Sequence, residues 1–204
     1  MGGEASRASM VLITVILISG MATAQTLVVN GDFDTNVAGW TELSIPLSWD
    51  GSSDWQGNPA SGSALILNNA AFADNSGAIQ CVDGIVAGEV YSLSAWLRVP
   101  SGQTGTGAAR VFIWYYSEPG CAGTWVGESS TPVMAASDVW IGLSSGDTVA
   151  PATAQSVKVY LNNFKYTETG IYQASYDHVA FTLIGVFADG FESGDTTEWS
   201  ASVP

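Results

Sequence analysis

Apolar and polar side chains alternate along three segments of the chain, residues 91–99, 110–116 and 156–162. Alternation of this kind is typical of β-strands that bury one face, whereas no segment beyond the first 24 residues keeps a helical periodicity for a useful length. Shorter stretches predict further strands at residues 26–29, 63–67, 78–82, 139–143 and 178–184, and turn-forming groups rich in Gly and Pro separate them. Many strands without intervening helices predict an all-β sandwich or jelly roll.

The alternation assigns every side chain of the three segments to one of two faces. One face is predicted to line the core: Tyr91, Leu93, Ala95, Leu97, Val111, Ile113, Tyr115, Val157, Val159 and Leu161. The other face carries Ser92, Ser94, Trp96, Arg98, Arg110, Phe112, Trp114, Tyr116, Ser156, Lys158, Tyr160 and Asn162. If the three strands share a sheet, aromatic rings and cations lie side by side on its outward surface.

The first 24 residues predict a secretory signal. Arg7 precedes a short apolar run at residues 10–18, and Ala22-Thr23-Ala24 is a small-residue cleavage site, so we expect cleavage after Ala24. The run is short for a bilayer span, and no second apolar stretch follows it. The expected organisation is a signal peptide at 1–24, one domain at 25–186 and an acidic tail at 187–204, in a secreted, soluble extracellular protein.

The net charge excludes two kinds of binding partner, and the two cysteines predict a disulfide. Loss of Glu4 and Arg7 with the leader reduces 19 acidic and 5 basic residues to 18 and 4, so the formal net charge stays at −14. Such a surface repels nucleic acid and anionic membranes, and we expect neither as a partner.

Cys81 and Cys121, the two cysteines of the chain, predict one disulfide in an oxidising compartment. A thiolate metal site is the alternative, and it lacks a nearby histidine.

The segment Asn30-Gly31-Asp32-Phe33-Asp34, followed by Gly39-Trp40, resembles the first strand of carbohydrate-binding modules of the galactose-binding-domain-like jelly-roll superfamily. The resemblance continues through residues 88–98, 150–157 and 176–180, and so extends over most of residues 25–185. It implies a galactose-binding-like jelly-roll β-sandwich that binds carbohydrate and has no catalytic role. His178 stands where that superfamily commonly has Asp.

The resemblance also implies a structural Ca²⁺ ion between the first strand and the last. Asp34 and Asp177 would supply carboxylates, and backbone carbonyls would complete the six to eight oxygen ligands that calcium prefers. The alternative is that Asp34 forms a local Asx-type turn and Asp177 is a solvated acid at a strand end.

The outward rings and cations are the candidate ligand-binding surface. Aromatic faces pack against the apolar C–H face of a pyranose, while Arg and Lys donate hydrogen bonds to its hydroxyl groups. The predicted ligand-binding residues are Trp96, Arg98, Arg110, Trp114, Tyr116, Lys158 and Tyr160. In the alternative interpretation, loops cover the rings and the cations pair with acidic residues, because aromatic residues stabilise sheets in any case. The competing function is an extracellular structural or adhesion domain that binds a protein partner.

The sequence does not favour an enzyme. His178 is the single histidine, and no nucleophile elbow, zinc-binding HExxH helix or phosphate loop occurs.

The tail segment DGFESGDTTEW, residues 189–199, echoes the opening NGDFDTNVAGW of residues 30–40. We expect the opening copy to be a structural strand, with Asp34 as the calcium ligand that the resemblance implies, and the closing copy to be a loosely held appendage.

Overall fold

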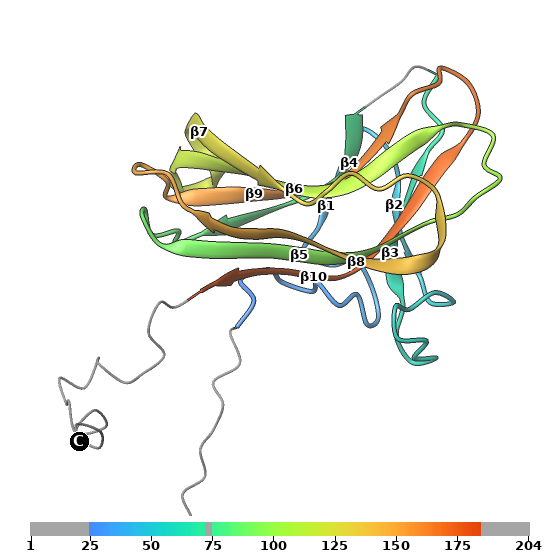
Figure 1. Cartoon of the computed structure of the whole chain (residues 1–204), viewed down its shortest axis with the longest axis horizontal. Helices are drawn as coiled ribbons and strands as arrows, with labels where there is room; N and C mark the ends of the chain where they lie inside the picture. Colours follow the sequence, from blue (N-terminus) through green and yellow to red (C-terminus); the bar gives the residue numbers. More distant parts are fainter. Residues whose placement is uncertain (1–24, 72–74, 185–204) are drawn as a thin grey trace, which may run out of the picture.

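The computed structural model describes residues 25–71 and 75–184, which form two five-stranded antiparallel sheets packed face to face (Figure 1). The first, called the β6 sheet, has the order β1-β4-β9-β6-β7. Its strands are β1 (Thr41–Leu43), β4 (Asn75–Asp83), β9 (Ser156–Lys165), β6 (Gly107–Glu118) and β7 (Ala122–Ser130). The second, called the β5 sheet, has the order β2-β3-β10-β5-β8. Its strands are β2 (Leu47–Asp50), β3 (Ser63–Asn68), β10 (Tyr172–Leu183), β5 (Val90–Val99) and β8 (Ser137–Val149).

The predicted all-β sandwich with one disulfide is confirmed. In the described ranges, the helical content is one 3-10 turn, η1 (Pro119–Cys121). The three alternating segments became β5, β6 and β9, and every residue assigned to their core faces is at most 1 % exposed. These side chains fill the space between the two sheets, as expected for a sandwich whose strands alternate inward and outward positions. No helix in the described part is long and apolar enough to cross a membrane.

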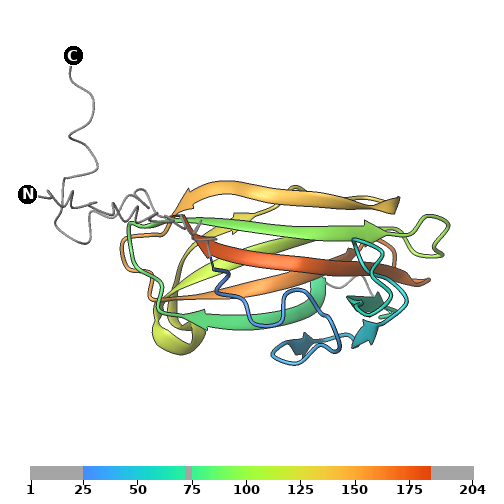
Figure 2. The same ribbon diagram turned by 90° about the horizontal axis from the view of Figure 1, so that it is seen from below.

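The two sheets divide the three alternating strands. β6 and β9 are hydrogen-bonded neighbours, with Phe112 opposite Tyr160, whereas β5 lies in the other sheet between β10 and β8. Figure 2 shows β5 and β10 together in the layer nearest the viewer. The outward side chains of β5 therefore face the opposite side of the molecule from those of β6 and β9.

The opening segment is a packed loop rather than the strand expected at residues 26–29. Thr26 makes one isolated bridge to Thr182 of β10, and regular pairing stops there; the backbone takes a positive φ of 52° at Asn30. Val179 donates its N–H to the carbonyl of Gly31 at 2.9 Å, and a side chain at Gly31 would collide with the Val179 carbonyl. Glycine is therefore required where this loop crosses the last strand.

The aromatic residues of the opening segment anchor that loop in the core. Phe33 is fully buried, and its ring centroid lies 5.7 Å from that of Trp40, which is 8 % exposed. The indole N–H of Trp40 donates to the carbonyl of Asn30, and the Asn30 side chain donates to the carbonyls of Asn36 and Ala38. The Phe and Trp of the motif thus serve folding, and its closing echo at 189–199, like the leader and the tail, lies outside the described residues.

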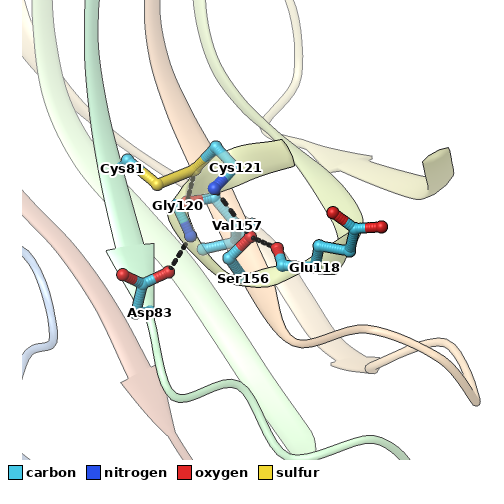
Figure 3. Close-up of a disulfide and its surroundings, with 7 residues drawn as sticks. All are labelled: Cys81, Asp83, Glu118, Gly120, Cys121, Ser156 and Val157. Carbon is cyan, nitrogen blue, oxygen red and sulfur yellow. Dashed lines mark hydrogen bonds between the residues drawn. A yellow bond between two sulfur atoms is a disulfide. The ribbon is translucent and has the colours of Figure 1, made fainter. Parts of the chain in front are cut away.

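The disulfide joins Cys81 of β4 to Cys121 at the end of η1, with their Cα atoms 5.9 Å apart (Figure 3). Two side chains hold the connection between β6 and β7 beside it. Asp83 accepts a hydrogen bond from the N–H of Gly120, and Ser156 Oγ accepts one from the N–H of Cys121. The disulfide therefore ties the turn between β6 and β7 to β4, across the intervening strand β9.

Removal of this disulfide is expected to lower stability without changing the fold. A closed loop of this length corresponds to roughly 4 kcal/mol in the chain-entropy model. The Cys81→Ala/Cys121→Ala variant should therefore melt well below the wild type in thermal unfolding monitored by circular dichroism. Reductant should lower the melting temperature of the wild type and leave that of the variant unchanged. Equal melting temperatures for the two oxidised proteins would contradict the prediction.

Candidate functional site

The outward side of the β6 sheet carries a cluster of aromatic rings and cations, called the aromatic face. It is formed by Arg110, Phe112, Trp114 and Tyr116 of β6 and by Lys158 and Tyr160 of β9. Antiparallel register places Trp114 directly opposite Lys158, and residues paired in this way lie on the same side of a sheet. Five of the seven predicted ligand-binding residues are therefore together on one surface.

Two rings form the base of the aromatic face. Phe112 and Tyr160 stack with their centroids 4.4 Å apart and their planes 9° apart, and they are only 4 % and 8 % exposed. Burial and a side-chain hydrogen bond with Tyr116 raise the pKa of Tyr160 above its ordinary value. These two rings are too buried to offer a binding surface of their own, and they support the neighbouring rings.

Trp114 and Tyr116 are half-buried and lie against this base. The centroid of the Trp114 ring is 4.9 Å from that of Tyr160 and 5.5 Å from that of Phe112, with both pairs tilted. Its indole N–H donates to the Glu128 carboxylate at 3.2 Å. The Trp114 ring is thus held in place from one side and its remaining surface is open to solvent.

The two cations of the aromatic face lie over rings. The Arg110 Cζ atom is 4.7 Å from the Phe112 centroid, and the Lys158 Nζ atom is 5.1 Å from the Tyr116 centroid. Neither cation has a carboxylate oxygen within 4.0 Å among residues 25–71 and 75–184, where the one such pair is His178 with Asp32. Cation–π contacts orient a guanidinium or ammonium group while leaving N–H donors available to a ligand.

The structure adds Trp125 and Glu128 of β7 to this surface. Trp125 pairs with Tyr116 and is 53 % exposed, and Glu128 pairs with Trp114. Gly127 pairs with the core residue Tyr115, and in a regular strand Trp125, two positions earlier, would face the same side. A register shift after Tyr115 pairs Trp125 with Tyr116 instead and turns it outward. Alternation did not place either residue on this surface, because β7 has small, exposed residues at its start and a bulge that interrupts the pattern.

A shallow cavity of about 180 Å³ extends the aromatic face at its other end. Arg110, Asn162, Phe164 and Tyr166 line it, together with Ala108, Ala109 and Val133. Phe164 is 37 % exposed and Tyr166 58 % exposed, with their rings edge to face at 5.2 Å. Lys158 and Phe164 are six positions apart on β9, or roughly 20 Å. The surface is therefore an elongated strip of rings and polar groups.

Trp96 and Arg98 are not part of the aromatic face, because β5 belongs to the other sheet. Trp96 stacks on Trp55 at a centroid distance of 4.3 Å. Arg98 donates from Nε to the carbonyl of Asp138 at 3.1 Å and from Nη1 to Ser53 Oγ at 3.3 Å. The single surface predicted from alternation is thus divided between two faces of the protein.

The two predicted calcium ligands lie near the junction of the opening loop with β10. Asp34 accepts a hydrogen bond from Ser61 and lines a cavity of about 220 Å³ with Asp32, Asp54 and His178. His178 takes a positive φ of 44° at the β10 bulge, and its Nδ1 atom lies 2.6 Å from Asp32 Oδ1. The described residues contain no group of three or more His, Cys, Asp or Glu side chains arranged to hold a metal ion.

Asp177 is fully buried rather than solvated. One carboxylate oxygen accepts the N–H of Trp55 at 3.1 Å and the other accepts the N–H of His178 at 2.7 Å. Burial raises the pKa of Asp177 to about 7; the two N–H donors oppose the rise, and the nearby carboxylates of Asp54 and Asp32 add to it. The site therefore concentrates negative charge around a buried acid.

The fold is shared with several solved structures. The CBM22-1 xylan-binding domain of Paenibacillus barcinonensis Xyn10C superposes with a TM-score of 0.56 at 14 % identity, covering 80 % of this chain and 97 % of that one. The C-terminal family 22 carbohydrate-binding module of Clostridium thermocellum Xyn10B gives 0.53 at 17 % identity, with 77 % and 94 % covered. The enzymatically active domain of bacteriophage CBA120 tailspike protein 4 gives 0.59 at 15 % identity.

The alignment with the tailspike protein covers 78 % of this chain and only 21 % of that chain, so the likeness is to one part of a larger protein. No model of a known protein family matches the sequence, and no curated protein matches it. At these identities the likeness concerns the fold, and this chain therefore has the galactose-binding-like jelly-roll fold of family 22 carbohydrate-binding modules.

Proposed function

We propose that this chain is an exported, non-catalytic module that binds a neutral polysaccharide or oligosaccharide on its aromatic face. The observation that carries the proposal is the elongated strip of partly open rings with two cations, neither of which has a carboxylate oxygen within 4.0 Å in the described part of the chain. The rings of Trp114 and Trp125 offer apolar surface for sugar C–H groups, Arg110 and Lys158 offer donors, and Glu128 offers an acceptor for hydroxyl groups.

The comparisons support this function and suggest a first ligand. Two of the structures with this fold are described as xylan-binding domains, and this chain spans nearly the whole length of each. Those are binding modules rather than catalytic domains, which supports a non-catalytic role here. Export is supported by the leader pattern and by the disulfide, since disulfides persist in oxidising compartments. Xylan is therefore the first polysaccharide to test.

A calcium ion held through Asp34 and Asp177 is part of the proposal. Each carboxylate oxygen has two lone pairs, so one hydrogen bond per oxygen at Asp177 leaves capacity for a cation. Asp32 and Asp54 add negative charge around the cavity, and backbone and side-chain oxygens would supply the remaining ligands. The ion would stabilise the crossing of the opening loop over β10.

Replacement of Trp114 is expected to reduce binding far more than stability. Trp114→Ala removes a half-exposed ring that contacts the ligand, so affinity for soluble xylan should fall roughly tenfold, or about 1.4 kcal/mol, in calorimetric titration. Trp114→Phe keeps an aromatic surface and should retain most of the affinity. A loss of several kcal/mol in unfolding free energy, the range of large-to-small core changes, with xylan binding intact, would show that the ring is structural.

Arg110→Ala is expected to weaken binding by roughly 1–3 kcal/mol, the scale of a hydrogen bond from a charged donor. Affinity electrophoresis in gels containing xylan measures this loss. The melting temperature should change little, because Arg110 has no ion-pair partner among the described residues and lies on the surface of the sheet. Wild-type retention by the variant would exclude Arg110 from the ligand contacts.

Chelation is expected to lower stability if calcium is bound as proposed. EDTA should reduce the melting temperature of the wild type and excess Ca²⁺ should restore it. Asp34→Ala should abolish this sensitivity, whereas Asp147→Ala, at an exposed position on β8, should retain it. Identical melting curves of the wild type with EDTA and with Ca²⁺ would remove calcium from this fold.

A further inference from the structure

The outward side of the β5 sheet has its own cavity, larger than that on the aromatic face. Its volume is about 660 Å³, within the range of small-molecule sites. Loop residues 51–59 form one wall, and Arg98 of β5 with Asp138 and Trp140 of β8 form the other. Figures 1 and 2 show this loop, in teal after β2, on the side of the β5 sheet that faces away from the β6 sheet. The cavity is therefore separated from the aromatic face by the whole sandwich.

A stack of two indole rings fixes the loop in position. The ring of Trp96 packs over Gly142, its partner on β8. A Cβ atom added at Gly142 would come within 3.2 Å of the Trp96 ring. Trp55, from the loop, stacks on Trp96 at 4.3 Å and donates its backbone N–H to the buried carboxylate of Asp177. The side chain of Asp54 accepts the N–H groups of Gln56 and Asn58 within the loop. These contacts hold the loop in place as a wall of the cavity.

An irregularity in strand pairing brings the polar groups of the cavity together. Leu97 pairs with Ile141 and Val99 pairs with Ser137, so the single residue Arg98 faces the three residues 138–140 of β8. Bulges of this kind re-aim side chains. Arg98 is oriented by its bonds to the Asp138 carbonyl and to Ser53, and it forms no ion pair within the described residues. These bonds use two of the five guanidinium N–H groups, so three remain as donors in a cavity that Trp140 also lines.

The side chains that line the cavity favour one chemical class of ligand. Trp140 offers an aromatic surface, Arg98 offers donors, and Asp54, Asp138 and Asn58 offer acceptors around the same space. Two carboxylates against one guanidinium, on a chain of formal net charge −14, disfavour an anion. A ring with many hydroxyl groups that both donate and accept, and with an apolar face, satisfies these groups together.

We propose that this cavity is a second carbohydrate-binding site, which takes a neutral sugar between Trp140 and the loop at 51–59, with Arg98 as the principal donor. It stands independently of ligand binding on the aromatic face. With sites on opposite sides, one protein molecule can hold two sugar chains at once, or gain avidity on one long chain that reaches both.

The proposal is tested by NMR titration, in which the indole N–H signals of Trp55 and Trp140 report on the cavity. The probes are xylohexaose, cellohexaose, mannohexaose and galactose, with glucuronic acid as the anionic comparison. In Trp114→Ala, which lacks the central ring of the aromatic face, at least one neutral probe should still give saturable shifts of these signals. Trp140→Ala and Arg98→Gln should each weaken that binding at least tenfold, and Val149→Ala, at a position of β8 that is 63 % exposed and outside the cavity lining, should not.

Melting temperatures identify any variant that fails to fold. If Trp140→Ala does not fold, Arg98→Gln carries the test, and Trp140→Phe, which keeps an aromatic ring, should retain binding. The proposal is overturned if no neutral probe shifts the Trp55 and Trp140 signals at millimolar concentration, if the shifts persist unchanged in Arg98→Gln, or if glucuronic acid binds more tightly than the neutral sugars. Failure of the aromatic face would appear separately, as equal xylan affinity of wild type and Trp114→Ala.

Discussion

The antiparallel pairing of β6 with β9 is the constraint on which the proposed binding surface depends. One register buries Val111 and Leu161 against the other sheet and, on the opposite side, brings Phe112 against Tyr160 and Trp114 against Lys158. A slip of β9 by one residue against β6 would move the core-facing side chains of β9 to the outward side. The burial of aliphatic residues in the core therefore also determines the position of every ring on the aromatic face. The disulfide secures β4 and the β6–β7 turn on either side of β9.

Alternation in the sequence predicted which side chains of each strand lie in the core, but not which strands share a sheet. A period of two assigns a side chain to one side of its strand, and it correctly placed Tyr91, Val111 and Val159 in the core. It does not say which strands share a sheet, because pairing is a property of the whole topology. Trp96 and Arg98 consequently lie on the far side of the protein, although their local pattern matches that of Trp114 and Tyr116.

Other parts of the site had no local signal. Trp125 reaches the aromatic face through a bulge in a strand whose exposed, small residues do not alternate. Asp177 is buried beside the loop carrying Trp55, whose backbone N–H it accepts, and this contact joins residues 122 positions apart. The motif resemblance predicted a first strand at the opening segment, and the structure has a loop there instead. The motif residues Gly31, Phe33 and Trp40 nevertheless make close contacts with the last strand or the core.

The stacked pair Phe112 and Tyr160 has a consequence for the thermodynamics of recognition. The two rings are buried on the solvent side of a sheet and form a small packed layer under Trp114. Ordering a large side chain on binding costs conformational entropy, and a ring that is already packed from beneath has lost most of that freedom during folding. The Phe112–Tyr160 pair therefore causes the conformational entropy of the Trp114 side chain to be lost during folding rather than during binding. Residues that never touch a sugar can in this way set how tightly it is held.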